Sequence, residues 1–205
     1  MAKRDVPEVN AGSMADIAFL LLIFFLVTTT IPKDTGLNRK LPPMDDSRAK
    51  PPVIKQKNIF TVLINAEDQL LVEEDVMELK DLRQAAVDFL DNNGDGSCSF
   101  CKGIKDEKSS DNPLKAVISL KNERETSYAA YIGVQNELVA AYNVIRNRRA
   151  LQLGPKSGFP EMNFVVMQNN YKDPKWGNDR DKAKLKTLID KIKVEIPQKL
   201  SEVVE

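Results

Sequence analysis

Hydrophobic residues are unevenly spread along the chain, and their spacing predicts a few separate elements. The densest apolar run covers residues 11–31, where Asp16 is the only charged residue. A helix over this segment would be about 31 Å long at 1.5 Å per residue, which matches the hydrocarbon core of a bilayer. We therefore expect one transmembrane helix over residues 11–31, preceded by a short segment, residues 1–10.

The rest of the chain divides into a tether and a folded domain. Prolines recur among charged and small residues over 32–57, which favours an extended linker. In residues 58–205, strands are expected at 59–64, 70–72, 116–120 and 164–167, and helices at 76–90, 127–149 and 179–193. This order predicts an α/β (α+β) domain with helices on one face of a mixed sheet. Residues 194–205 fit either a strand or a helical tail.

Two helices carry more specific signals. Ser127 is placed to cap the start of the long helix. The helix over 179–193 has its leucines and isoleucines on one face, which suits either core packing or a partner surface. The face comprises Leu185, Leu188, Ile189 and Ile192.

Composition narrows the classes of function. Lys plus Arg and Asp plus Glu number 30 each, so no overall basic field favours nucleic acid. The chain has no histidine, which excludes Ser-His and Cys-His nucleophile pairs and His-ligated metals. With only two cysteines, it is not a disulfide-framework protein. We expect neither covalent catalysis nor a cofactor.

An acid inside an apolar helix is the strongest functional signal in the sequence. An ionised carboxylate near the middle of such a helix costs about 3 kcal/mol, and such a group usually handles protons or ions. The small residues Gly12 and Ser13 allow another helix to approach Asp16 closely. Two alternatives stay open: Asp16 as a helix N-cap, and Thr28 and Thr30 bonding their own backbone rather than hydrating a proton path.

The apolar run also has features of a signal peptide. Lys3 and Arg4 precede it, but the expected small-x-small cleavage site is missing, so we expect an uncleaved anchor. Basic residues lie on both sides of the run, and the positive-inside rule does not fix its orientation.

The N-terminal sequence resembles that of a known protein family. Glu8-Val-Asn10, followed six residues later by Asp16 and the apolar run 17–26, is similar to the signature of ExbD/TolR proteins, and most similar to members from Bacteroidetes. Ser13 replaces a proline that is common in the family three residues before the acid. The resemblance covers residues 8–31, 58–90 and 114–150, and omits an insertion at 91–113 and the chain beyond about residue 170.

This resemblance implies a single-pass inner-membrane subunit of a proton-driven motor. Asp16 would carry the proton and Asn10 would match the family's polar residue before it. The N-terminus would be cytoplasmic and the folded domain periplasmic. The implied partners are a pentamer of the ExbB/TolQ type, a second copy of this chain paired through its transmembrane helix and periplasmic domain, and a TonB-like transducer that opens outer-membrane transporters.

The insertion contains two cysteines. Cys98-Ser-Phe-Cys101 lies in a loop rich in Gly and Ser, whereas a thioredoxin-like site places its first cysteine at a helix start after a strand. No second pair of ligands completes a zinc site. In an oxidising periplasm we expect a local disulfide.

The insertion also copies part of a calcium loop. Asp91, Asn93 and Asp95 occupy the first, third and fifth positions, but the twelfth is Lys102 rather than Glu. This pattern favours a flexible acidic loop over a metal site.

Two alternative functions remain open. One is a TolR- or MotB-like envelope subunit linked to peptidoglycan, although no stretch resembles an OmpA-type wall-binding domain. The other is a membrane-anchored periplasmic redox protein that uses Cys98 and Cys101. Loss of function in Asp16→Asn would indicate the motor, and loss in Cys98→Ser would indicate the redox protein.

Overall fold

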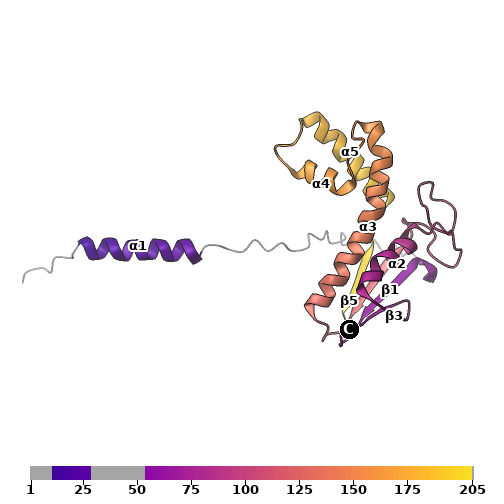
Figure 1. The fold of residues 1–205 in the computed structure, drawn as a ribbon, viewed down its shortest axis with the longest axis horizontal. Coiled ribbons are helices and arrows are strands. Elements are labelled where there is room, and N and C mark those ends of the chain that lie inside the picture. Colours follow the sequence, from indigo (N-terminus) through magenta and orange to yellow (C-terminus); the bar gives the residue numbers. More distant parts are fainter. Residues whose placement is uncertain (1–10, 29–53, 205) are drawn as a thin grey trace, which may run out of the picture. The chain divides into compact units, whose positions relative to one another are not determined.

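A computed structural model describes residues 11–28 and 54–204. The chain divides into two compact units, residues 1–50 and 51–205. In the first unit the described residues form the helix α1, Ala11–Thr28 (Figure 1). Within the described ranges, no helix has the length and apolar character needed to cross a membrane. The end of the predicted transmembrane segment, the predicted segment 1–10 and most of the predicted linker lie outside these ranges.

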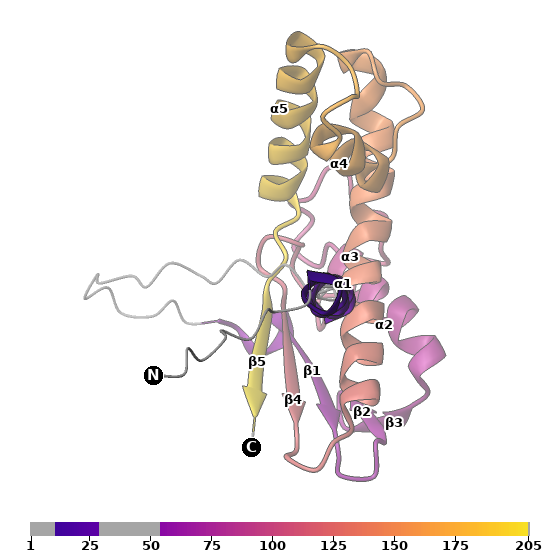
Figure 2. The ribbon, with the colours of Figure 1, turned by 90° about the vertical axis from the view of Figure 1, so that its left-hand side faces the viewer.

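The second unit is built on a mixed five-stranded sheet in the order β3-β2-β1-β4-β5 (Figure 2). β1 pairs antiparallel with β2 and parallel with β4, and β5 is parallel to β4. A short 3-10 helix, Gln56–Asn58, precedes the sheet. The strands are β1 Ile59–Ile64, β2 Leu70–Val72, β3 Asp75–Met77, β4 Val117–Asn122 and β5 Leu200–Val204.

One face of this sheet is buried beneath two helices, α2 (Leu79–Asp91) and α3 (Tyr128–Ser157). Residues of β1 and β4 alternate between buried and half-buried, as expected when successive side chains point to opposite faces. Val62, Leu82 and Leu138 are fully buried in the resulting sheet core. The predicted mixed sheet is therefore confirmed, and α2 and α3 are the predicted helices that cover this face.

Helix α3 is longer than the sequence pattern predicted. Ser127 caps its start, because the Ser127 hydroxyl accepts a hydrogen bond from the Ala130 amide at 3.2 Å. The helix then runs for 30 residues, about 45 Å, through Pro155 to a left-handed Gly158. Gly154 is required near this end, because a Cβ there would lie 2.2 Å from the Phe159 carbonyl oxygen.

The C-terminal part of α3 supports a second, all-helical core. Helices α4 (Phe164–Lys172) and α5 (Asp179–Glu195) gather around it beyond the end of the sheet (Figure 2). The apolar face of α5 is buried here, so of its two predicted uses core packing is the one observed. This helical core comprises Ala150, Phe159, Phe164, Met167, Leu185, Leu188, Ile189 and Ile192.

One predicted element is wrong. Residues 164–167 form the start of α4 rather than a strand. The Asn163 side chain caps this helix by accepting from the Val166 amide at 2.9 Å. Phe164 and Met167, three residues apart, are fully buried, which is helical spacing and not strand alternation.

The helix predicted over 76–90 begins three residues later, because its first residues belong to β3. Glu73 and Glu74 both have positive φ, 51° and 78°, and form the two-residue turn between β2 and β3. This turn conformation usually carries Asn or Gly, so two glutamates gave no hairpin signal. The undecided residues 194–205 supply the end of α5 and the edge strand β5.

Candidate functional site

Helix α1 carries the acid identified from the sequence. Asp16 lies in its second turn and is the only charged residue of the helix. Gly12 precedes it by one turn, and the neighbouring side chains are large, apolar and exposed, including Ile17 at 58% and Leu20 at 57%. The backbone also places Ser13 and Thr28 in α1, whereas the predicted path residues Asn10 and Thr30 lie outside the described residues.

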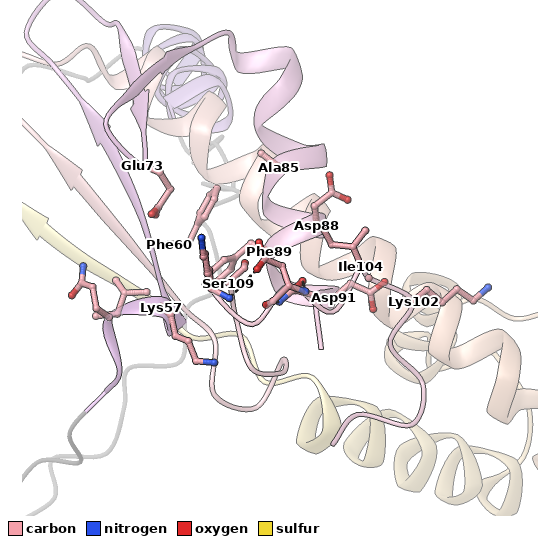
Figure 3. A pocket seen from close by; sticks show the side chains of 16 residues that line it. Lys57, Phe60, Glu73, Ala85, Asp88, Phe89, Asp91, Lys102, Ile104 and Ser109 are labelled. Carbon is pink, nitrogen blue, oxygen red and sulfur yellow. Dashed lines mark hydrogen bonds between the residues drawn. The ribbon is translucent and has the colours of Figure 1, made fainter. Parts of the chain in front are cut away.

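A groove of about 850 Å³ opens in the second unit between β1, the C-terminal half of α2 and the insertion (Figure 3). Its floor includes Phe60 and Phe89, whose ring centroids are 5.0 Å apart. Charges of both signs line it, comprising Lys57, Lys102, Lys108, Glu73, Asp88, Asp91 and Asp106. The lining therefore combines an aromatic floor with charged side chains of both signs.

The insertion is tied to the end of α2 by Asn92, which is 2% exposed. The Asn92 amide donates to the carbonyls of Asp106 and Ser110, both at 2.8 Å, and its side-chain oxygen accepts from the Asp106 amide at 2.9 Å. Gly103 donates its amide to the Asp91 carbonyl at 3.0 Å, and a Cβ on Gly103 would overlap the α2 backbone. The loop is therefore held in place, which corrects the expectation of a flexible insertion.

Asp111 anchors the second leg of the insertion beside the start of β1. Its carboxylate lies 2.5 Å from the Lys57 ammonium and accepts from the Asn58 amide at 3.3 Å. The Asn58 oxygen in turn accepts from the Asp111 backbone amide at 2.8 Å. The hydrogen bond from Lys57 lowers the pKa of Asp111 despite its burial.

Cys98 and Cys101 form a disulfide, with their Cα atoms 5.6 Å apart. Asn93 holds the start of this ring, accepting from the Cys98 amide at 2.8 Å and donating to the Cys98 carbonyl at 3.0 Å. Inside the ring, Phe100 is half-buried against the sheet core. Its centroid lies 4.5 Å from the guanidinium carbon of Arg149 on α3.

The partial calcium pattern does not converge on one point. Asp91 binds the Arg148 guanidinium, Asn93 binds the cysteine ring, and Asp95 binds Lys115 at 2.8 Å. The hydrogen bond from Lys115 lowers the pKa of Asp95 well below its usual range. Among the described residues, no group of three or more Cys, Asp or Glu side chains is arranged to hold a metal ion.

One known protein family matches more than half of the chain. The model of the biopolymer transport protein family ExbD/TolR matches residues 2–147, which include α1, the groove and most of the sheet. The chain belongs to the ExbD/TolR family. No curated protein matches it.

ExbD/TolR proteins are non-enzymatic inner-membrane subunits that serve biopolymer transport or envelope motors. They generally work with ExbB/TolQ and with TonB/TolA partners. In this chain the ExbD/TolR match ends inside α3, so α4, α5 and β5 lie beyond it.

Arginines of α3 at this boundary join the insertion to the segment beyond the ExbD/TolR match. Arg148 donates to both carboxylate oxygens of Asp91, one of them at 2.8 Å. Arg149 donates to both carboxylate oxygens of Glu195 at the end of α5, at 2.6 and 3.0 Å. Neighbouring arginines of one helix therefore hold two segments that are distant in sequence.

Arg146 and Tyr142 hold the link between α5 and β5. The buried Arg146 donates from Nε and Nη2 to the Ile196 carbonyl at 3.0 and 2.8 Å. Its guanidinium carbon lies 5.6 Å from the Tyr142 ring centroid and 5.4 Å from that of Phe164. The Tyr142 hydroxyl donates to the Lys199 carbonyl at 3.2 Å, and burial raises the pKa of Tyr142 to about 12.

Asp16 and the two cysteines are recognisable from the sequence, whereas these anchors are not. Asn92 and Asp111 resemble ordinary loop residues until their burial is known. The run Arg146-Asn-Arg-Arg149 within a helix was the available signal. Successive helix positions point in different directions, so the three arginines cannot all lie on the solvent-facing side of the helix.

Proposed function

We propose that this chain is an inner-membrane subunit of a proton-motive-force-driven motor of the ExbB–ExbD type, which energises TonB-dependent outer-membrane transport. In this proposal residues 11–31 span the membrane, the N-terminus is cytoplasmic and the second unit is periplasmic. Asp16 is the observation that carries it, because a lone acid among exposed apolar side chains needs a polar or protein environment. The family match supports the assignment.

Asp16 would act by alternating between protonated and ionised forms as the helix faces different surroundings. One charge crossing a potential of 100 mV corresponds to about 2.3 kcal/mol, so a few protons can drive rotation or rocking of packed helices. Gly12 and Ser13 would allow a neighbouring helix to approach the acid. Asn10, Thr28 and Thr30 are the proposed polar positions along the proton path.

The partners follow from this mechanism. A pentamer of ExbB/TolQ-type subunits would surround the transmembrane helices of two copies of this chain. The periplasmic unit would pair with its copy and engage a TonB-like transducer. The groove beside the insertion offers an apolar floor with a charged rim, which is a suitable lining for a protein segment.

The decisive experiment is growth on a nutrient taken up by TonB-dependent transport. Wild type, Asp16→Asn and Asp16→Glu are compared at matched expression in a strain without its other ExbD-like copies. We expect Asn to abolish growth while the assembled complex persists, and Glu to keep part of it, since only Glu retains a titrating carboxyl. Normal growth together with an intact outer membrane in Asp16→Asn would refute proton carriage by Asp16.

The family description also covers TolR, so the envelope branch is tested in parallel. A TolR-like subunit predicts that Asp16→Asn weakens the outer membrane and leaves nutrient uptake intact. Pull-down of cell wall with the full chain would then be positive. In the same strain, Cys98→Ser should grow on the nutrient; growth lost only in Cys98→Ser would instead support a redox protein.

A further inference from the structure

The disulfide in the insertion closes a ring of only four residues, Cys98 to Cys101. A ring this short removes little chain entropy, so its contribution to global stability is at the low end for disulfides. Its local effect is larger. Of the two residues enclosed, Ser99 is exposed and Phe100 lies against the sheet core and Arg149. The ring therefore acts mainly on the position of Phe100.

Arg149 transmits this position to α5. Phe100 lies on the guanidinium at 4.5 Å, while the nitrogens of the same guanidinium donate to Glu195. A cation against an aromatic face contributes about 0.5–1 kcal/mol at an exposed site. The cysteine ring, α3 and the end of α5 thus form one chain of contacts.

We propose that Cys98–Cys101 is a thiol–disulfide exchange site, and that its redox state controls the attachment of the insertion to α5 through Phe100 and Arg149. The co-reactant is a dithiol of an envelope thiol oxidoreductase. This inference rests on the proposed periplasmic location of the second unit, but not on proton carriage by Asp16, because it concerns only contacts within that unit.

The exchange proceeds in two steps that transfer two electrons. A partner thiolate attacks Cys101 Sγ, the Cys98–Cys101 bond breaks, and its electron pair leaves on Cys98 Sγ. The second partner thiolate then attacks the partner sulfur of the mixed disulfide, which releases Cys101 as a thiolate. The Cys98 and Cys101 thiolates each take up one proton. The partner ends as a disulfide and the chain as a dithiol.

The local geometry favours Cys98 as the leaving sulfur. The Cys101 amide donates to Cys98 Sγ at 3.2 Å, and a donor in this position stabilises a thiolate. Both cysteines are half-buried and their neighbour Ser99 is exposed, so a partner thiol reaches the ring without unfolding the domain.

Reduction should act on a limited set of contacts. The anchors at Asn92 and Asp111 do not involve sulfur, and they hold both legs of the insertion in either redox state. The pair between Arg148 and Asp91 is also independent of the ring. Only Phe100 is released, and Arg149 and Glu195 are left more exposed to water.

Amide hydrogen exchange on the full-length protein in detergent tests this proposal. The oxidised protein is compared with protein reduced by dithiothreitol, with the redox state verified by alkylation and mass. We expect exchange in the last turn of α5 to become about two- to fivefold faster on reduction, the factor that loss of one such cation–aromatic contact gives. Exchange in β1 and α2 should not change.

Variants separate the ring from the contact. The double variant Cys98→Ser/Cys101→Ser should exchange like the reduced protein and ignore dithiothreitol. Phe100→Ala should also show the faster exchange of the reduced protein at α5, even with its disulfide intact. Ser99→Ala should exchange like the wild type. Unchanged exchange at α5 in reduced wild type or in Phe100→Ala would overturn the proposal. So would a disulfide that dithiothreitol reduces only when the domain unfolds.

Discussion

The two hydrophobic cores of the second unit are built from different kinds of contact. The sheet core joins residues from β1, β2, β4, α2 and α3, which are far apart in sequence. The helical core uses only Ala150 to Ile192, a continuous stretch of chain. Contacts that are local in sequence form cooperative units that open on their own, so the helical core is expected to be the less stable of the two.

The way in which the two cores are connected also affects how the helical core can open. In the chain, the helical core follows the part of α3 that packs in the sheet core and precedes β5, a strand of the sheet. Ile196, directly after α5, is fully buried in the sheet core. The helical core can therefore open while its two ends stay fixed, provided that Arg146 and Tyr142 keep the α5–β5 link in place.

The sharpest test places one cavity in each core. Leu120→Ala and Met167→Ala each remove a fully buried side chain and should each cost about 2–5 kcal/mol. The first should lower the free energy of unfolding of the whole unit. The second should open α4 and α5 while the sheet persists. Urea unfolding with amide exchange at each element distinguishes these results; equal loss of protection everywhere in Met167→Ala would show a single cooperative unit.

Overpacking offers a second test within α3. Gly154→Ala places a Cβ 2.2 Å from the Phe159 carbonyl and should destabilise the helical core by about 1–3 kcal/mol. Gly133→Ala is the matched control, because its Cβ meets only the end of the Leu79 side chain at 3.2 Å. The better helix propensity of alanine, worth about 1 kcal/mol, should make that variant neutral or more stable. Thermal unfolding of both variants measures the contrast, and equal destabilisation would contradict it.

These two cores also differ in how much of them the sequence predicts. Alternation in β1 and β4, and helical spacing in α2 and α5, gave the correct elements because one face of each is buried. The four apolar residues 164–167 suit a strand or a helix equally, and only the burial of Phe164 and Met167 decides. A short apolar run has no period of its own, so tertiary packing selects its structure.

The candidate sites show the same limit. Asp16 and the cysteine pair stand out in sequence, since their chemistry is unusual for their surroundings. Arg146 does not, because its role depends on the carbonyl of Ile196, 50 residues away. Hydrogen bonds between distant segments leave no local pattern in the sequence, and bonds of this kind hold the link between α5 and β5 against α3.

Removing Arg146 should weaken the link between the cores rather than either core. Arg146→Met leaves the Ile196 carbonyl without its two donors, which should cost about 1–3 kcal/mol. We expect amide exchange to rise in β5 and in the residues before it, with smaller changes in β1. Arg180→Met, on the exposed start of α5, is the control and should leave exchange unchanged. An Arg146→Met protein with wild-type protection in β5 would assign the link to Tyr142 alone.

Acid should release the insertion before it affects either core. The pKa of Asp111 is lowered in the folded protein from its ordinary 3.8, so its contribution to stability is present above that value and is lost as pH falls through the lower, folded pKa. Lys55, Lys57 and Lys115 face this carboxylate, and Asp95 shares Lys115.

Asp111→Asn should therefore be less stable than wild type near neutral pH, and its stability should approach that of wild type in acid. Chemical unfolding at about pH 7 and about pH 3 measures this convergence. Because asparagine keeps an acceptor for the Asn58 amide, the effect should be the smallest of the four, and a gap that stays constant with pH would show that Asp111 anchors the loop without its charge.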